Sequence, residues 1–313
     1  MRHLLVLGAA LVLSLQAHAA KVIWVYFPNS DISWIYGLND DNAVAGTYYM
    51  RDRTVHGFYG PAGGPYHDFQ FAGASTGARA IDNKGNIVGV SHFWDGEKYC
   101  DYVPFERTPD GKIGQIAHGD TKLGGFVNGM VLSSGAFVGD TCDAHRDSVG
   151  YRGRNARWRT DLDIPIPGAQ PRGVNKAGTV VGQFKGDDKH WHGFILKDGT
   201  AGIVDFPGAK RTQLSGINDA GIAVGIYYPH GYHYRPFSLD TNTNVFTDIR
   251  FNRHQYGEAF ATAINNKGYT TINVGNGRGY VLCPEGADCP GGQDIKVETR
   301  RVTAGRFPVW RPR

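Results

Sequence analysis

The chain has 313 residues and a formal net charge of +4 at pH 7, with 33 Lys and Arg against 29 Asp and Glu. This mild balance argues against a nucleic-acid binder, which would carry a clustered basic stripe. Glycine occupies 44 positions and methionine only 3, a composition typical of β structure with many tight turns. The length is compatible with one closed all-β repeat domain.

The first twenty residues form a segment of their own. Arg2 provides a basic start, an apolar run covers residues 4–15, and Ala17 and Ala19 flank His18 in an A-x-A pattern. This arrangement is typical of a secretory signal peptide that is cleaved after Ala19 or Ala20. The apolar run is shorter than the ~20 residues that a membrane anchor needs. We therefore predict a signal peptide over residues 1–20 and an exported protein, secreted or periplasmic, with no transmembrane anchor.

A short motif, such as "GINDAGIAVG" from Gly216, then recurs six times at intervals of roughly 40 to 50 residues. Its third residue is Asn39, Asp82, Leu132, Asn175, Asn218 and Asn265. A second marker, an aromatic residue as in "HGF", follows each copy at Phe58, Phe105, Tyr151, Phe194, Phe237 and Tyr280. The two markers recur with the same period. A period of this length, built from short strands, is typical of the blades of a β-propeller.

The fifth copy shows the strands of one repeat most clearly. Four β segments, "QLSGIN", "IAVGIYY", "RPFSLD" and "VFTDIRF", are separated by joints rich in Asn, Asp and Gly, which predicts a four-stranded meander. We expect Asn218 to bond its own backbone while Gly221 takes a positive φ, so that the motif forms a hairpin turn. A calcium loop is the alternative, but the acidic ligands of an EF-hand are missing.

The two ends of the chain complement each other. The sixth copy lacks a fourth strand, and "KVIWVYFP" near the N-terminus resembles the missing one. Joining them would remove an exposed sheet edge. We therefore predict an all-β fold: a six-bladed β-propeller of four-stranded antiparallel blades over residues 21–282, closed by an N-terminal strand that joins the last blade. Residues 283–313 are predicted to form a disulfide loop and a basic tail that is solvated or loosely docked.

Four cysteines in an exported chain predict two disulfides. Cys283 and Cys289 enclose the short loop "PEGAD", and Cys100 and Cys142 pair by elimination. Metal ligation is the alternative, but no C-x-x-C spacing is present. The sequence gives no reason to expect a metal site at these cysteines.

The phrasing "GINDAGIAVG", "HGF", a "DG" turn and "VDFPGA" resembles the HAF family of bacterial extracellular repeats over nearly the whole mature chain. The resemblance implies export and repetitive β structure, and it implies no catalytic residues. Two features depart from the pattern. Leu132 stands where Asn is expected, and the C-terminus lacks the hydrophobic sorting helix of some similar proteins.

The longer joints are expected on the face opposite the tight turns, if the small-residue strands lie at the axis. Function on β scaffolds usually resides in such loops. The candidate ligand-binding residues on this face share an imidazole or aromatic side chain. They are His92, Trp94, His145, His190, Trp191, His192, His230, His233 and Tyr234.

Several interpretations of this cluster stay open. The side chains could merely cap the blades, or they could bind a glycan or a protein through aromatic contacts and hydrogen bonds. A propeller-type polysaccharide lyase or hydrolase is the catalytic alternative. In it His190 and His192 would hold a metal with Asp187 or Asp188, or His230 and His233 would act as acid and base. A structural or assembly module is a further alternative.

No recognised catalytic motif is present. We therefore favour a monomeric binding or recognition protein without a cofactor, whose catalytic residues, if there are any, cannot be named. The predicted partner is an extracellular glycan or protein.

Overall fold

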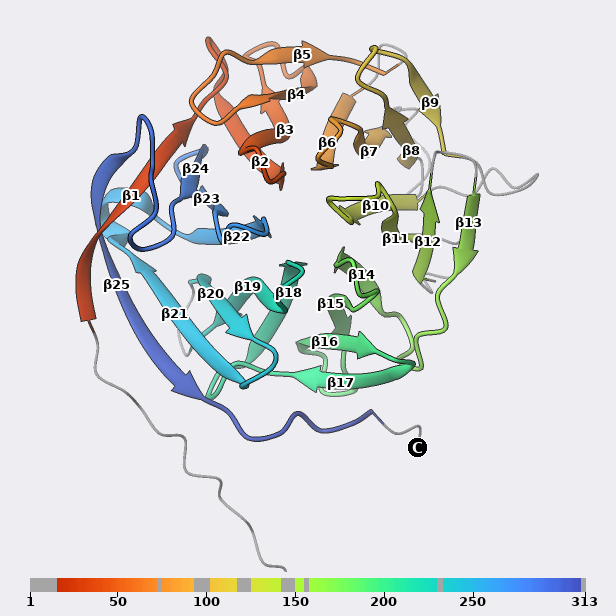
Figure 1. Cartoon of the computed structure of the whole chain (residues 1–313), viewed down its shortest axis with the longest axis vertical. Coiled ribbons are helices and arrows are strands. Elements are labelled where there is room, and N and C mark those ends of the chain that lie inside the picture. The colour runs from red at the N-terminus through yellow and green to blue at the C-terminus, as the bar shows by residue number, and fades with distance from the viewer. Residues whose placement is uncertain are drawn as a thin grey trace, which may run out of the picture.

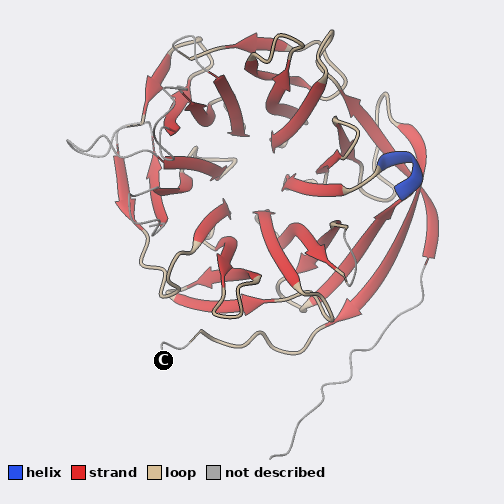
Figure 2. Cartoon of the chain, turned by 180° about the vertical axis from the view of Figure 1, so that it is seen from behind, coloured by secondary structure: helices blue, strands red, loops and turns tan. Residues whose placement is uncertain are grey.

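The computed structural model describes residues 16–71, 75–92, 102–116, 125–141, 150–154, 158–229 and 233–310. Within these residues the regular secondary structure is β-strand apart from one short helix, α1 (Arg253–Tyr256), at the outer edge of the ring (Figure 2). The strands form a ring of sheets around a central axis, and the first strand of each repeat lies nearest that axis (Figure 1). No helix among the described residues is long and apolar enough to cross a membrane.

Each repeat supplies consecutive strands to the ring. Repeat 1 comprises β2 (Ile32–Leu38), β3 (Ala43–Tyr49), β4 (Val55–Pro61) and β5 (His67–Phe69). Repeat 2 comprises β6 (Ser75–Ile81), β7 (Ile87–His92), β8 (Tyr102–Arg107) and β9 (Ile113–Gln115). Repeat 3 comprises β10 (Gly125–Met130), β11 (Phe137–Thr141), β12 (Gly150–Arg154) and β13 (Trp158–Asp161). Repeat 4 comprises β14 (Gln170–Val174), β15 (Val180–Lys185), β16 (Trp191–Lys197) and β17 (Thr200–Val204).

The last two repeats and the chain ends supply the other strands. Repeat 5 comprises β18 (Arg211–Ile217), β19 (Ile222–Tyr228), β20 (Arg235–Asp240) and β21 (Val245–Phe251). Repeat 6 comprises β22 (Ala259–Ile264), β23 (Thr270–Val274) and β24 (Arg278–Leu282). The ends contribute β1 (Gln16–Val25) and β25 (Gln293–Thr303).

The sheets confirm the all-β fold with four-stranded antiparallel blades. Repeats 1 to 4 each form a separate sheet of four strands. The strand β1 pairs antiparallel with β24, Val22 opposite Leu282 and Val25 opposite Gly279. The N-terminal strand therefore completes the sixth repeat, as its sequence predicted.

The C-terminal segment differs from the prediction. Repeats 5 and 6 do not form separate sheets, because β25 pairs with both β21 and β1 and joins them into one sheet of nine strands. The predicted disulfide loop is present, but residues 293–303 are a strand of the sheet and not part of a loosely docked tail. Val297 and Val302 of β25 are buried, and Val309 bridges to Gly202 of repeat 4. The sequence did not predict this strand, because its many charged residues are typical of a solvated tail. The strand is held by backbone pairing with β21 and β1.

The recurrent turn has two roles, of which the sequence predicted one. The Oδ1 atom of Asn218 accepts a hydrogen bond from the backbone N–H of Ile222 at 2.9 Å, and Gly221 has a φ of 80°, as expected. The Nδ2 atom of Asn218 also donates to the carbonyl oxygen of Asn265 in the next repeat, at 3.1 Å. The same inter-repeat bond joins Asn175 to Asn218, Asn265 to Asn39 and Asn39 to Asp82. We call these bonds the asparagine latches.

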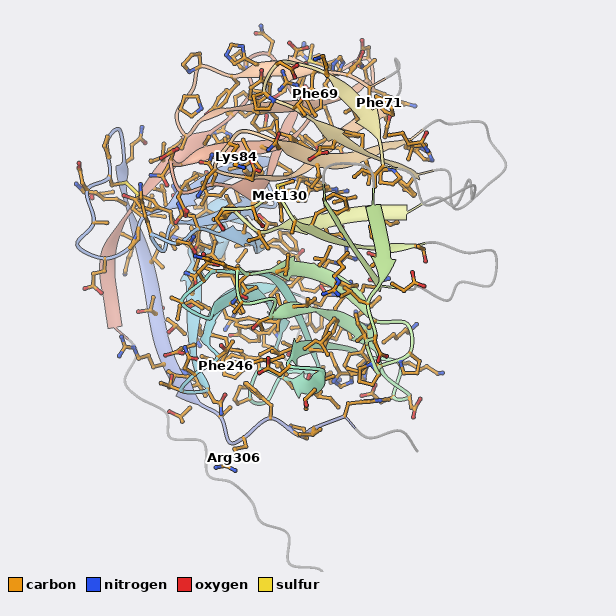
Figure 3. All side chains as sticks on the ribbon, turned by 45° about the vertical axis from the view of Figure 1, so that its right-hand side comes forward. Phe69, Phe71, Lys84, Met130, Phe246 and Arg306 are labelled. Carbon is orange, nitrogen blue, oxygen red and sulfur yellow. A yellow bond between two sulfur atoms is a disulfide. The ribbon has the colours of Figure 1, made fainter. Side chains whose placement is uncertain are left out.

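The second marker forms the core of each blade. Its six aromatic residues, Phe58, Phe105, Tyr151, Phe194, Phe237 and Tyr280, are at most 1% exposed. In repeat 1 the ring of Phe58 covers Gly46, where an added Cβ would lie 2.6 Å from the ring. Further rings pack between blades, since Phe69 and Phe71 lie 5.8 and 5.6 Å from Phe105 of the next repeat (Figure 3). Gly46 is thus needed for packing.

The axis is as crowded as the small residues predicted. A Cβ added to Gly37 would lie 2.8 Å from the Cα of Ala80 in the next innermost strand, and one added to Gly173 would lie 2.8 Å from the Cα of Gly216. Small residues at this position let the innermost strands approach each other closely.

One of the two predicted disulfides lies within the described residues. Cys283 and Cys289 are bonded, and both are buried in the core cluster between the last and first repeats. Cys100 and Cys142 lie outside the described residues, so that their pairing stays a prediction.

We expect Asn218→Ala to lower the free energy of unfolding by about 2–4 kcal/mol, because it removes two hydrogen bonds and leaves buried partners unsatisfied. Chemical denaturation measures the loss. The matched control is Asn266→Ala, which removes inter-repeat bonds from the neighbouring but exposed residue and should cost less than about 1 kcal/mol. Equal losses in the two variants would contradict a special role for the buried latch.

Candidate functional site

All six innermost strands carry a β-bulge at the same position. In β2 the pairing register shifts between Ile35 and Gly37, and corresponding shifts occur in β6, β10, β14, β18 and β22. A bulge leaves one residue out of the ladder and redirects its side chain. The bulged residues are Tyr36, Arg79, Asn128, Arg172, Ser215 and Thr262. We call them the axial ring.

The axial ring surrounds a small cavity. Five of its members, all except Arg79, line a space of about 40 Å³ together with the small residues of the innermost strands. Arg79 joins the ring through Tyr36, because its guanidinium lies 4.3 Å from the centre of the Tyr36 ring. Every member is polar and only partly buried. Side chains from six distant parts of the sequence therefore meet at one place.

Two guanidinium groups face one carboxylate at the axis. Arg172 donates to the Oδ1 atom of Asn128 at 2.9 Å, and Asn128 donates to the Oδ1 atom of Asp140 at 2.7 Å. Burial raises the pKa of Asp140, while the positive charges of Arg172 and Arg79 oppose that rise. Burial lowers the pKa of Arg172, which the charge of Asp140 counteracts. The described groups at the axis thus leave one positive charge uncompensated.

One donor of the ring has no partner within the described part of the chain. Among the described residues the buried Nε atom of Arg79 has no hydrogen-bond partner. Buried donors are rarely left unpaired in folded proteins. A guanidinium is suited to bind carboxylate, sulfate or phosphate oxygens in pairs. Arg79 is therefore the strongest candidate for a ligand-binding residue.

Aromatic side chains lie two residues before the bulges, near the start of the innermost strands. Trp34 contacts Tyr49 at 5.8 Å, Phe126 contacts Tyr102 at 4.3 Å, and Phe260 contacts Tyr234 at 5.5 Å between ring centres. Burial is the largest cause that raises the pKa of Tyr49, and Tyr36 and Tyr102 contribute. Because the turns alternate between faces in an antiparallel meander, these aromatics lie on the face of the longer joints.

The structure brings some of the predicted binding residues toward the axial site. His92 lies 4.8 Å from Tyr102, which contacts Phe126, and Tyr234 contacts Phe260. His233 and Tyr234 also line a cavity of about 250 Å³ with Arg235 and Arg250.

The other predicted residues do not extend this group. Trp94, His145 and His230 lie outside the described residues. His190, Trp191 and His192 lie at the start of β16, and within the described residues no contact joins them to His92, His233 or Tyr234. The nine residues therefore do not form one described cluster.

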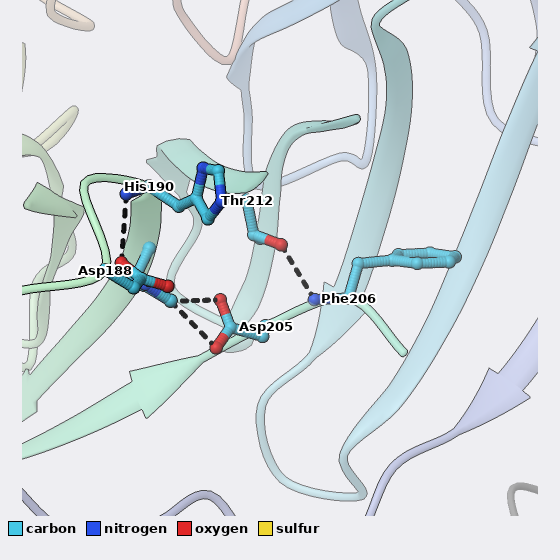
Figure 4. Close-up of polar contacts among 6 residues, drawn as sticks. Asp188, His190, Asp205, Phe206 and Thr212 are labelled. Atoms are coloured by element: carbon cyan, nitrogen blue, oxygen red, sulfur yellow. Dashed lines mark hydrogen bonds and ion pairs between the residues drawn. The ribbon is translucent and has the colours of Figure 1, made fainter. Parts of the chain in front are cut away.

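His192 is held between two carboxylates. Its Nδ1 atom lies 2.9 Å from Oδ1 of Asp205, and its Nε2 atom lies 3.1 Å from Oδ1 of Asp188. Figure 4 shows Asp205 and Asp188 at this site. The backbone N–H of His190 also donates a hydrogen bond to Asp188, at 2.9 Å. Burial lowers the pKa of His192, but hydrogen bonds to Asp205 and Asp188 outweigh it and raise the pKa overall.

This clamp repeats a pattern of the scaffold. In repeat 1 His56 stacks on Tyr48 at 4.9 Å and lies 4.0 Å from Asp68. In repeat 4 His192 stacks on Phe184 at 5.4 Å and bonds Asp205. The pattern therefore recurs, with an aromatic residue on the second strand and an imidazole on the third. The carboxylate lies on the fourth strand in repeat 1 and directly after it in repeat 4. We interpret His192 as a residue that holds its blade together.

The proposed metal site is not supported by the described side chains. Both ring nitrogens of His192 already face carboxylates. No group of three or more His, Cys, Asp or Glu within the described part of the chain is arranged to hold a metal ion.

No protein-family model matches the chain, and no curated protein matches its sequence. The resemblance to HAF repeats therefore stays a prediction. TolB from Acinetobacter baumannii aligns with a TM-score of 0.53 at 14% identity, over 81% of this chain and 66% of TolB. This likeness supports the β-propeller fold alone.

Two further solved structures align more weakly. A putative gluconolactonase has a TM-score of 0.49 at 11% identity, over 85% of this chain and 92% of its own. A virginiamycin B lyase from Staphylococcus aureus has a TM-score of 0.44 at 13% identity, over 87% of this chain and 100% of its own.

The His192 clamp predicts a pH dependence of stability. Because the folded pKa of His192 is raised, its contribution is fully present below the unfolded value of about 6.5 and is lost as the pH rises through the folded value. Urea denaturation across pH 5.5–8.5 should show this loss in the wild type, and His192→Asn should flatten it. The control His190→Asn should keep the wild-type slope. Parallel curves for His192→Asn and wild type would contradict the raised pKa.

Proposed function

We propose that the protein is an exported recognition propeller whose six repeats act as six blades and bind an acidic extracellular ligand at the axial site. The main support for this proposal is the uncompensated positive charge at the axis, which the guanidinium of Arg79 provides beside Tyr36. A ligand carboxylate or sulfate would compensate this charge and accept hydrogen bonds from the guanidinium.

An acidic glycan matches the site better than a small anion. Trp34, Phe126 and Phe260 provide flat apolar surfaces next to the polar ring, and such side chains offer large contact areas at low entropic cost. A sugar ring can pack against an aromatic face while its carboxylate reaches Arg79. The longer joints of the same face, which carry His92, His233 and Tyr234, would contact more distant sugar units.

The test compares an acidic oligosaccharide with its neutral counterpart. We expect tetragalacturonate to bind in calorimetry and its methyl ester to bind at least about tenfold more weakly, since hydrogen bonds to charged groups contribute ~1.5–3 kcal/mol. Arg79→Gln should weaken tetragalacturonate binding by a similar factor. The control Arg51→Gln removes an arginine whose side chain is 91% exposed, and it should leave binding unchanged.

Three outcomes would overturn this proposal. In the first, neither tetragalacturonate nor a sulfated oligosaccharide binds. In the second, Arg79→Gln folds normally and binds like the wild type. In the third, an acidic peptide binds while every acidic saccharide fails, which would make a protein the partner.

A catalytic function is the second candidate, and one observation favours it. The Nδ1 atom of His233 lies 3.5 Å from Oε1 of Glu258, beside the cavity of about 250 Å³. A histidine oriented by a carboxylate can act as an acid or base. Turnover of a polysaccharide panel that disappears in His233→Ala would establish it.

Export makes a prediction about the N-terminus. β1 begins at Gln16, inside the predicted signal peptide, and its first residues pair with β25. Cleavage after Ala19 or Ala20 would remove that pairing and keep Val22 to Val25 on β24. Intact mass spectrometry of the exported protein should therefore show Ala20 or Lys21 as its first residue. A mass that includes residues 1–19 would contradict cleavage.

A further inference from the structure

A second and much larger cavity lies between repeats 5 and 6. Its volume is about 590 Å³, within the ~300–1,000 Å³ of typical small-molecule sites. Its walls come from β20 and β21 of repeat 5, from β23 and β24 of repeat 6, from β1 and β25, and from the disulfide loop. Of its lining residues only Ile264 also lines the axial cavity.

The strand β25 explains why this space exists. Between repeats 4 and 5 the sheets meet face to face, and Val204, Phe206 and Leu214 pack in one apolar cluster. Between repeats 5 and 6 the outer strands β21 and β1 are instead joined through β25. Small side chains then face the gap, among them Ser238, Thr247 and Ala287.

The disulfide loop forms a fixed wall. Cys283 is bonded to Cys289, and between them the backbone N–H of Ala287 donates to the carbonyl of Pro284 at 3.1 Å. The hydroxyl of Tyr269 donates to the carbonyl of Asp288. These bonds hold the loop in place beside the cavity, so that the site is preformed.

The lining is amphipathic. Its apolar part consists of the side chains of Ile222, Ile249, Ile264, Leu282 and Val297. The hydroxyls of Ser238, Thr247 and Thr299 also line it. Lys21, Glu285 and Asp294 supply the charged groups of the lining, which leaves one negative charge in excess. An apolar chain could fill the interior while a cation contacts the charged groups.

We propose that this cavity binds a small amphipathic cation, namely an aliphatic chain of about ten carbons with an amine or quaternary ammonium group. The apolar side chains bind the chain, and Glu285 and Asp294 favour the positive head group. The hydroxyls of the lining accept hydrogen bonds from an amine where the head group carries protons.

The test uses the uncleaved chain of 313 residues and two probes that share a ten-carbon chain, because cleavage after Ala19 or Ala20 would add a positive α-amino group to the lining. Calorimetry below the micelle concentration should show saturable binding of decyltrimethylammonium and at least about tenfold weaker binding of decanoate. Thr247→Trp places a large side chain in the cavity and should lower affinity for the cation at least about tenfold. Thr243→Trp is the matched control, because Thr243 is exposed in the turn of the same hairpin and does not line the cavity. It should bind like the wild type.

The charge preference has its own variant. Glu285→Gln with Asp294→Asn should reduce the ratio of cation to carboxylate affinity at least about threefold. The proposal is overturned if decanoate binds as tightly as decyltrimethylammonium, or if Thr247→Trp folds normally and binds unchanged. Where Thr247→Trp fails to fold, Ser238→Leu fills the same space and decides the question. These results are independent of the axial site, because Arg79→Gln should leave decyltrimethylammonium binding unchanged.

Discussion

Most neighbouring repeats are joined by a carboxamide that forms hydrogen bonds in two directions. An asparagine side chain has an acceptor and a donor on one rigid group. In the latch the acceptor fixes the turn of its own repeat, and the donor reaches the same turn of the next repeat, as in Asn175, Asn218 and Asn265. Local turn geometry and the angle between neighbouring blades are therefore set by the same residue. The spacing of the innermost strands, and with it the shape of the axial site, depends on this bond.

The latch is interrupted where the axial site is most polar. Asp82 has no amide donor and Leu132 has no polar group, so the bond is missing from repeat 2 to repeat 3 and from repeat 3 to repeat 4. The backbone N–H of Asn83 donates to the carbonyl of Leu132 instead, at 2.8 Å. On the other side of Leu132, Asn128 donates to the carbonyl of Pro171 at 3.1 Å and holds Arg172. Hydrogen bonds of Asn128 thus join repeats 3 and 4, which no asparagine latch joins.

The parts of the fold that depend on local chemistry could be predicted from the sequence. The turn of Asn218 and Gly221 and the buried aromatic of "HGF" rest on neighbouring residues, and both occur as expected. The strand β25 could not be predicted, because its partners are distant in sequence and its charged residues resemble a tail. The axial ring was not predicted, because in the sequence each of its members is only a variable residue that precedes a Gly or Ala. The latch donor of Asn218 was missed because it acts between repeats.

This contrast separates scaffold from site. A residue that recurs in equivalent places, such as His56 and His192 with their aromatic and carboxylate neighbours, satisfies a need that the repeats share. A ligand is not sixfold symmetric, so its contacts have to come from positions where the repeats differ. The residue type at the bulge position differs between repeats. It is Tyr36, Arg79 or Arg172 on strands that are otherwise similar. A regular ring thereby has an irregular, positively charged centre, and in the proposed binding function a rigid ring would hold Arg79 in place before the ligand binds.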